Sequence, residues 1–140
     1  MGRIMGIDYG MRRIGIALSD VTHLIAKGSE TINWNGRDID WALNRIGEII
    51  KEQDVTDIVL GRPLRTDGTG SETQEKVEGF AKLLEDTYGL PIHYIDERFT
   101  TVIAAQYLHA AGKKADKHKK VIDQVAAEVF LQDYLDSHRS

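Results

Sequence analysis

Cysteine is absent from the 140-residue chain, which excludes disulfide bonds, thiolate metal ligands and a cysteine nucleophile. Any metal would therefore be held by oxygen or imidazole ligands, and oxygen ligands favour a hard cation. The chain also lacks an apolar run that approaches the roughly 20 residues of a membrane-spanning helix. It lacks a leader-like segment before the first strand pattern at Arg3. These absences predict a soluble, cytoplasmic protein.

The chain also lacks a positive net charge. Its formal net charge is -4, which argues against indiscriminate coating of nucleic acid. The basic residues are nevertheless unevenly distributed. One short segment contains Lys113, Lys114, Lys117, His118, Lys119 and Lys120. This basic run fits contact with a polyanion, although a solvated start of a helix explains it equally well. The length suits one well-filled core, so we expect residues 1–140 to form a single domain.

Hydrophobic periodicity predicts an alternation of strands and helices. Strands are expected over 3–8, 14–20, about 23–33, 57–61 and 91–95, and helices over about 37–53, 71–88, 101–111 and 119–136. The first three strands form an antiparallel meander, with the third at an edge of the sheet. With right-handed crossovers, the following αβαβ segment completes a mixed five-stranded sheet with helices on both faces. This α/β order is that of ribonuclease H-like domains.

Three acidic residues occupy positions from which a carboxylate could act. Asp8 ends a buried strand, although an acid there also suits a cap for the following turn. Glu97 follows another strand, where open α/β sheets bind ligands, but a surface pair with Arg98 is the alternative. Asp123 shares a helix face with apolar residues, although a solvated boundary position would also explain it. Asp96 is interpreted as a turn or orienting group.

If these acids converge, their mutual repulsion requires a divalent cation, and oxygen ligands suit Mg²⁺ or Mn²⁺. Such ions support phosphodiester cleavage. Arg62 and Arg65 lie in a polar loop from which they could contact phosphate, and Gly10 would let a phosphate backbone approach Asp8. His93 is expected to be structural, and the other histidines show no metal-ligand spacing.

Four blocks together resemble the YqgF/RuvX family over essentially the whole chain. They are Ile7–Gly10 with Arg13–Ala17, Val59–Leu64 with Asp67–Thr69, Asp96–Thr101, and Lys119–Ala127. The resemblance implies a ribonuclease H-like fold and a metal-dependent nuclease that matures the 5′ end of precursor 16S ribosomal RNA. It also implies that Asp8, Glu97 and Asp123 are the catalytic, metal-binding acids.

Other functions remain open at this point. The same chemistry could act on four-way DNA junctions, as in Holliday junction resolvases. A non-catalytic module could bind nucleic acid through Arg62, Arg65 and the lysines of the basic run (Lys113, Lys114, Lys117, Lys119, Lys120). The segment around Asp8 also resembles the first phosphate loop of actin-like ATPases, which need two such domains. Ribosomal partners, the oligomeric state and a supporting role for Asp20 or Asp96 are left open by the sequence.

Overall fold

The structure is a computed structural model that describes residues 2–10, 12–62, 72–96 and 115–138. Within those ranges, it leaves the side chains of residues 62, 72–74, 96 and 115–123 undescribed. The elements are β1 (Arg3–Tyr9), β2 (Arg13–Ser19), β3 (Ala26–Asn33), α1 (Ile39–Gln53), β4 (Val55–Arg62), α2 (Glu72–Tyr88), β5 (Ile92–Asp96) and α4 (Ala115–Ser137). The helix predicted over 101–111 lies outside the described residues.

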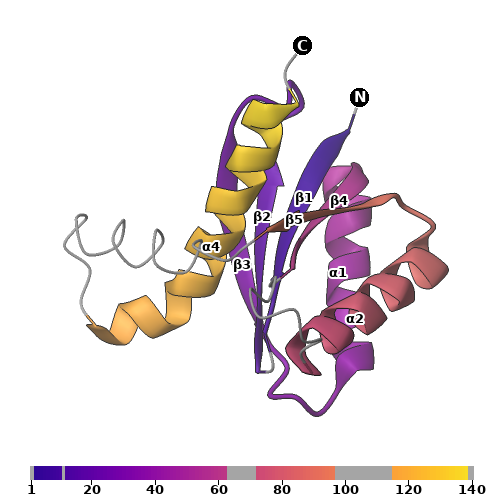
Figure 1. The fold of residues 1–140 in the computed structure, drawn as a ribbon, viewed down its shortest axis with the longest axis vertical. Helices are drawn as coiled ribbons and strands as arrows, with labels where there is room; N and C mark the ends of the chain where they lie inside the picture. The colour runs from indigo at the N-terminus through magenta and orange to yellow at the C-terminus, as the bar shows by residue number, and fades with distance from the viewer. Residues whose placement is uncertain (1, 11, 63–71, 97–114, 139–140) are drawn as a thin grey trace.

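The five strands form one sheet in the order β3-β2-β1-β4-β5. β1 pairs antiparallel with β2, and β2 pairs antiparallel with β3, whereas β1, β4 and β5 are parallel. Figure 1 shows α4 on one face of this sheet and α1 with α2 on the other. The predicted mixed five-stranded α/β architecture is therefore confirmed, with β3 at an edge as expected.

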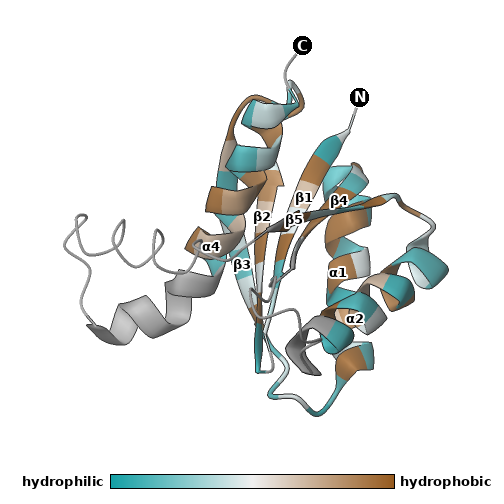
Figure 2. Cartoon of the chain, in the orientation of Figure 1, coloured by the Kyte–Doolittle hydropathy of each residue, from teal (hydrophilic) through white to brown (hydrophobic). Residues whose placement is uncertain are grey.

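Each face of the sheet has its own apolar core. One core lies under α1 and α2 and includes Ile7, Ile16 and Leu60 from the strands. The other lies under α4 and includes Ile4 and Val59. Because consecutive side chains of a strand point to opposite faces, β1 and β4 contribute to both cores. Figure 2 shows the apolar residues concentrated on these strands and on the helix faces turned toward them.

Polar side chains of α4 cover the free edge of β3. Gln132 Oε1 accepts from the backbone N–H of Ala26 at 2.8 Å, and Glu128 Oε1 accepts from that of Gly28 at 2.9 Å. These bonds satisfy edge N–H groups that would otherwise be open to another strand. They also fix α4 along the antiparallel half of the sheet. In the part of the chain that the structure describes, no helix is long and apolar enough to cross a membrane.

Candidate active site

Asp8 is the second-last residue of β1, at the end of the sheet where β1, β4 and β5 finish. Ile4 belongs to the core under α4, and Gly6 lies directly against that helix. The alternation of strand side chains puts Asp8 on the same face. Asp8 is half-buried and pairs in register with Gly15 of β2. Its carboxylate therefore lies where the core under α4 meets solvent.

The turn that follows Asp8 has its own reason to contain Gly10. The N–H of Gly10 donates to the carbonyl oxygen of Arg13 at 2.9 Å, so this hydrogen is already bonded without a cap from Asp8. A Cβ on Gly10 would lie 2.5 Å from the same carbonyl oxygen. The Gly10 carbonyl in turn accepts from Trp34 Nε1 at 3.0 Å. The closeness of the hairpin itself thus explains Gly10, with no need for an approaching phosphate.

The helix α4 lies in direct contact with β1. A Cβ on Gly6 would fall 2.8 Å from the Cβ of Leu131 and 3.1 Å from the carbonyl oxygen of Ala127. Leu131 and Ala127 are four residues apart, so they form one row along the helix. Asp123 is the next position of that spacing toward the start of α4.

One turn of α4 also lies over the row of the sheet that contains Asp8. In the strand register, Asp8 pairs with Gly15, and Gly15 pairs with Thr31 of β3. Gln124 donates from Nε2 to Thr31 Oγ1 at 2.9 Å. Since Gln124 is the neighbour of Asp123 in the chain, the backbone of this turn is anchored at the level of Asp8.

β4 and β5 end at the same edge of the sheet as β1. Leu60 pairs with Ile7, and Gly61 pairs with Ile95 one position later. Ile95 packs against the core under α4, which is the face that carries Asp8. β5 ends at Asp96, and Glu97 is the next residue of the chain.

The remaining predicted site residues divide into two groups. Glu97, Arg65, Lys113 and Lys114 lie outside the described residues. Arg62 ends β4, while Asp123, Lys117, Lys119 and Lys120 are on α4, with their side chains undescribed. α4 begins at Ala115, earlier than the predicted start at 119, so these lysines belong to the helix. Within the described residues, no group of three or more histidines or acids is placed to hold a metal.

Asp20, considered from the sequence as a supporting acid, lies at the opposite end of the sheet from Asp8. It follows Ser19, the last residue of β2, whose Oγ accepts from the Ile4 N–H at 2.8 Å. Asp20 Oδ1 accepts from Leu24 N–H at 2.8 Å, and Oδ2 accepts from the Thr22 hydroxyl. These hydrogen bonds lower the pKa of Asp20 to about 2. Asp20 is therefore a turn-capping residue and no part of the Asp8 site.

Two exposed arginines that the sequence patterns do not single out lie at the same end of the sheet as Asp8. Arg12 is in the β1–β2 turn, and Arg37 is in the turn that follows β3. The two turns meet, because Asn35 N–H donates to the Arg12 carbonyl oxygen at 2.9 Å. A basic residue in the turn after a strand-end acid, such as Arg12, is recognisable in the sequence. The position of Arg37 is not, because only the pairing of β2 with β3 brings its turn alongside the first.

Known proteins similar to this chain identify its family. The family model described as "RuvX: Holliday junction resolvase" matches residues 2–137. A relative from Bacillus subtilis (strain 168), named "Putative pre-16S rRNA nuclease", is 45% identical over 135 residues, which cover 96% of this chain and 98% of the relative. A relative of the same name from Ligilactobacillus salivarius is 42% identical over 138 residues, 98% of this chain and 94% of the relative.

Solved structures give the same fold at low sequence identity. RuvC of T. thermophilus in complex with a Holliday junction substrate has a TM-score of 0.62 and 15% identity, covering 98% of this chain and 95% of that one. The Fowlpox virus resolvase in complex with Holliday junction DNA has a TM-score of 0.60 and 13% identity, covering 99% of both chains. With its ribonuclease H-like fold and a family match over nearly its whole length, the chain belongs to the RuvX family.

Proposed function

We propose that this protein is a divalent-metal-dependent endonuclease that matures the 5′ end of precursor 16S ribosomal RNA in the cytoplasm. As a member of the RuvX family it is a nuclease, a hydrolase of phosphodiester bonds. One observation carries the proposal. Asp8, Gly15 and Thr31 are paired across three neighbouring strands, and Gln124 of α4 is hydrogen-bonded to Thr31. It supports a site formed by Asp8 together with Asp123, the neighbour of Gln124.

Glu97 is the third acid of the proposed site. It follows β5 directly, and β5 ends at the same edge as β1. His93 and Ile95 precede Glu97 at two-residue spacing, and both face α4. His93 contacts the ring of Tyr134, and Ile95 packs against the core under that helix. The period of two in a strand is the physical argument for preferring Glu97 to Asp96.

The donor chemistry fits a hard divalent cation. Asp8 offers carboxylate oxygens from a half-buried position beside solvent, where a cation can keep part of its water shell. The chain contains no cysteine that would favour a softer metal. Asp8, Glu97 and Asp123 would hold Mg²⁺ or Mn²⁺. When bound, such a cation supplies an activated water and stabilises the charge of the leaving oxygen.

The protein's own groups bind and orient the substrate. Arg12 and Arg37 are exposed at the edge that carries Asp8, so they can neutralise phosphates on either side of the scissile bond. Arg62, Arg65 and the basic run (Lys113, Lys114, Lys117, Lys119, Lys120) would extend this contact along the nucleic acid. Gly15, opposite Asp8, leaves that position of β2 without a side chain that could compete for the substrate.

The names of the relatives favour precursor ribosomal RNA as the substrate. The family description and the likeness to RuvC favour a second candidate, a four-way DNA junction. The two candidates share the chemistry of phosphodiester cleavage. They differ in the shape of the nucleic acid that Arg12, Arg37 and the basic run must contact. RNA is our first choice because the relatives that are 42% and 45% identical are named for it.

A substrate comparison tests this order. The full chain is incubated with labelled precursor 16S RNA and with a labelled four-way DNA junction, each with Mg²⁺, with Mn²⁺ and with a chelator. We expect metal-dependent cleavage of the RNA near its 5′ end and slower cleavage of the junction. Cleavage of the junction alone would reverse the assignment, and chelator-resistant cleavage would contradict metal dependence. Asp86→Asn, which changes an exposed acid on α2, is the control for nonspecific effects of charge.

A further inference from the structure

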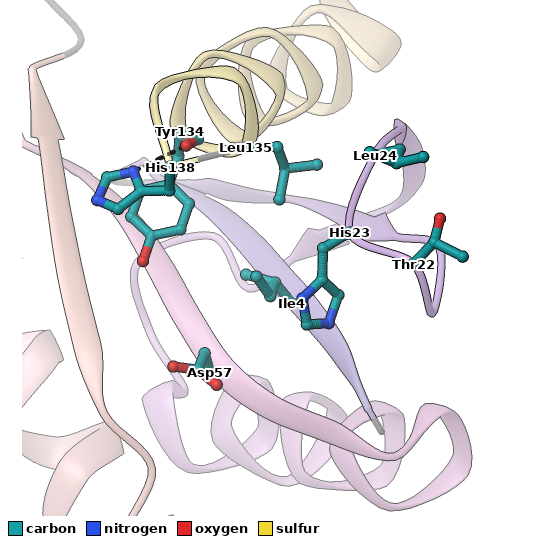
Figure 3. A pocket seen from close by; sticks show the side chains of 8 residues that line it. All are labelled: Ile4, Thr22, His23, Leu24, Asp57, Tyr134, Leu135 and His138. Atoms are coloured by element: carbon teal, nitrogen blue, oxygen red, sulfur yellow. Dashed lines mark hydrogen bonds between the residues drawn. The ribbon is translucent and has the colours of Figure 1, made fainter. Parts of the chain in front are cut away.

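A cavity of about 510 Å³ lies at the end of the sheet opposite Asp8 (Figure 3). It forms where β1 and β4 begin, beside the β2–β3 connection and the last turn of α4. Ile4 and Leu135 give it an apolar lining. Its polar lining comes from Thr22, His23, Asp57, Tyr134 and His138.

The hydrogen bonds of the two lining histidines fix which ring nitrogens remain available. His23 Nε2 lies 2.6 Å from the carbonyl oxygen of Gly2, and His138 Nδ1 lies 2.9 Å from that of Tyr134. A carbonyl oxygen can only accept, so each of these nitrogens carries the hydrogen. In the neutral imidazoles, His23 Nδ1 and His138 Nε2 are therefore hydrogen-bond acceptors.

The other polar groups have the same character. The Thr22 hydroxyl, at the rim of the cavity, donates to Asp20, so its oxygen can only accept a further bond. Asp57 accepts from His93 Nε2 at 3.0 Å and from Thr56 Oγ1 at 2.9 Å, and its side chain remains 33% exposed. A carboxylate has about four lone-pair sites, so Asp57 can accept further bonds. The cavity thus presents acceptors around one negative charge.

An aromatic face adjoins this charge. The rings of Tyr134 and His138 are stacked, with their centroids 4.0 Å apart. In Figure 3 the Tyr134 hydroxyl points toward Asp57 from across the cavity. Burial and, to a lesser extent, the charge of Asp57 raise the pKa of Tyr134, so the phenol stays neutral. A planar cation can stack on such a pair while its N–H groups reach a carboxylate.

We propose that this cavity binds a guanidinium group, which is planar, cationic and purely a hydrogen-bond donor. Its N–H groups would bond to Asp57 and to His23 Nδ1, and its plane would lie against an open face of the stacked Tyr134–His138 pair. The guanidinium belongs either to a small molecule or to an arginine side chain of a peptide, because both present the same chemistry. This site is independent of the nuclease site, from which it is separated by the length of the strands.

Nuclear magnetic resonance of the full chain at pH 8, above the ordinary titration range of imidazole, tests the proposal. The probes are agmatine, as the small molecule, and N-acetylarginine amide, as the peptide mimic. We expect saturable shifts of the His23, Tyr134 and His138 ring resonances with at least one probe. The probe that binds more tightly identifies the source of the guanidinium. N-acetylcitrulline amide, which is uncharged, should bind at least about tenfold more weakly.

Variants separate the site from general effects. Asp57→Asn keeps an oxygen for His93 but removes the charge, so affinity should fall at least about tenfold. His138→Ala removes one ring of the aromatic stack and should also weaken binding. Asp133→Asn, an exposed acid of α4 outside the cavity, should leave affinity unchanged. The proposal is overturned by an absence of shifts at about 10 mM probe, or by equal affinity of wild type and a folded Asp57→Asn protein.

Discussion

Gly6 and Leu131 are in contact so close that a Cβ on Gly6 would lie 2.8 Å from the Leu131 Cβ. This contact sets the separation between β1 and α4, the two elements that carry Asp8 and Asp123. A side chain at residue 6 would push the helix away from the strand. The geometry of the proposed site therefore depends on a glycine two residues before its first acid.

Gly6→Ala should destabilise the protein by about 1–3 kcal/mol, because the extra methyl overpacks the strand–helix contact. Urea unfolding measures the change. Gly79→Ala is the matched control, since its Cβ would meet nothing within 4 Å on the surface of α2. In that helix interior, alanine should stabilise the protein by about 0.5–1 kcal/mol. Equal effects of the two substitutions would contradict the close contact at Gly6.

Gln124→Ala should reduce the cleavage rate more than it reduces stability. The lost hydrogen bond to Thr31 is worth about 1 kcal/mol, but it anchors the turn of α4 that contains Asp123. A small displacement of a reacting group can lower kcat by about tenfold to a hundredfold. Single-turnover cleavage measures the rate, and urea unfolding measures stability.

Gln132→Ala is the control on the same helix. It removes bonds to Ala26 and Leu24 at the far end of β3, so it should lower stability while leaving kcat nearly unchanged. If both variants lost stability and neither lost rate, Gln124 would have only a structural role.

Arg12→Gln and Arg37→Gln should each weaken RNA binding and reduce its dependence on salt. A lost phosphate contact lowers the slope of log K against log salt by about 1. Fluorescence anisotropy over a range of KCl concentrations gives this slope. Lys51→Gln, at the end of α1 that leads away from the Asp8 edge, should change neither affinity nor slope. If the two arginine variants had the same slope as the wild type and Lys51→Gln, the arginines would not contact the nucleic acid.

Asp20 should make stability depend on pH in the acid range. Its pKa is lowered from 3.8 to about 2, with the bond from Thr22 the largest cause, followed by the bonds from Leu24 and Ile25. Because the folded-state pKa is the lower one, the unfolded chain binds the proton first as the pH falls. The stabilisation is present above pH 4 and is lost as the pH falls through about 2. The stability difference between wild type and Asp20→Asn, from urea unfolding, should shrink over this range; a constant difference would contradict the assignment.

Much of the fold follows from periodicity in the sequence. β1 and β4 are apolar runs because both of their faces are covered, and β3 is more polar because it lies at an edge. The third strand begins at Ala26 rather than 23 because Asp20 holds the chain from Thr22 to Ile25 in a capped turn. Such side-chain capping depends on tertiary geometry that a periodicity pattern does not contain.

The candidate site is only partly encoded in local patterns. Asp8 is recognisable as an acid at the end of a buried strand, and the structure agrees with that position. Gln124 and Thr31, which are hydrogen-bonded, lie 93 positions apart in the chain, and no local spacing specifies such a contact. Arg37 reaches the same edge only because the turn after β3 bonds to Arg12. Long-range register, rather than composition, decides these relationships.

The proposed nuclease site depends most directly on Asp8 as a metal-binding catalytic acid. Asp8→Asn keeps the shape of the side chain and removes its charge, and cleavage of precursor 16S RNA is measured against Mg²⁺ concentration for both proteins. Circular dichroism and urea unfolding confirm that the variant is folded. If Asp8 binds the metal, cleavage should be abolished at every Mg²⁺ concentration while RNA binding persists. Unchanged cleavage by the folded Asp8→Asn protein would contradict it.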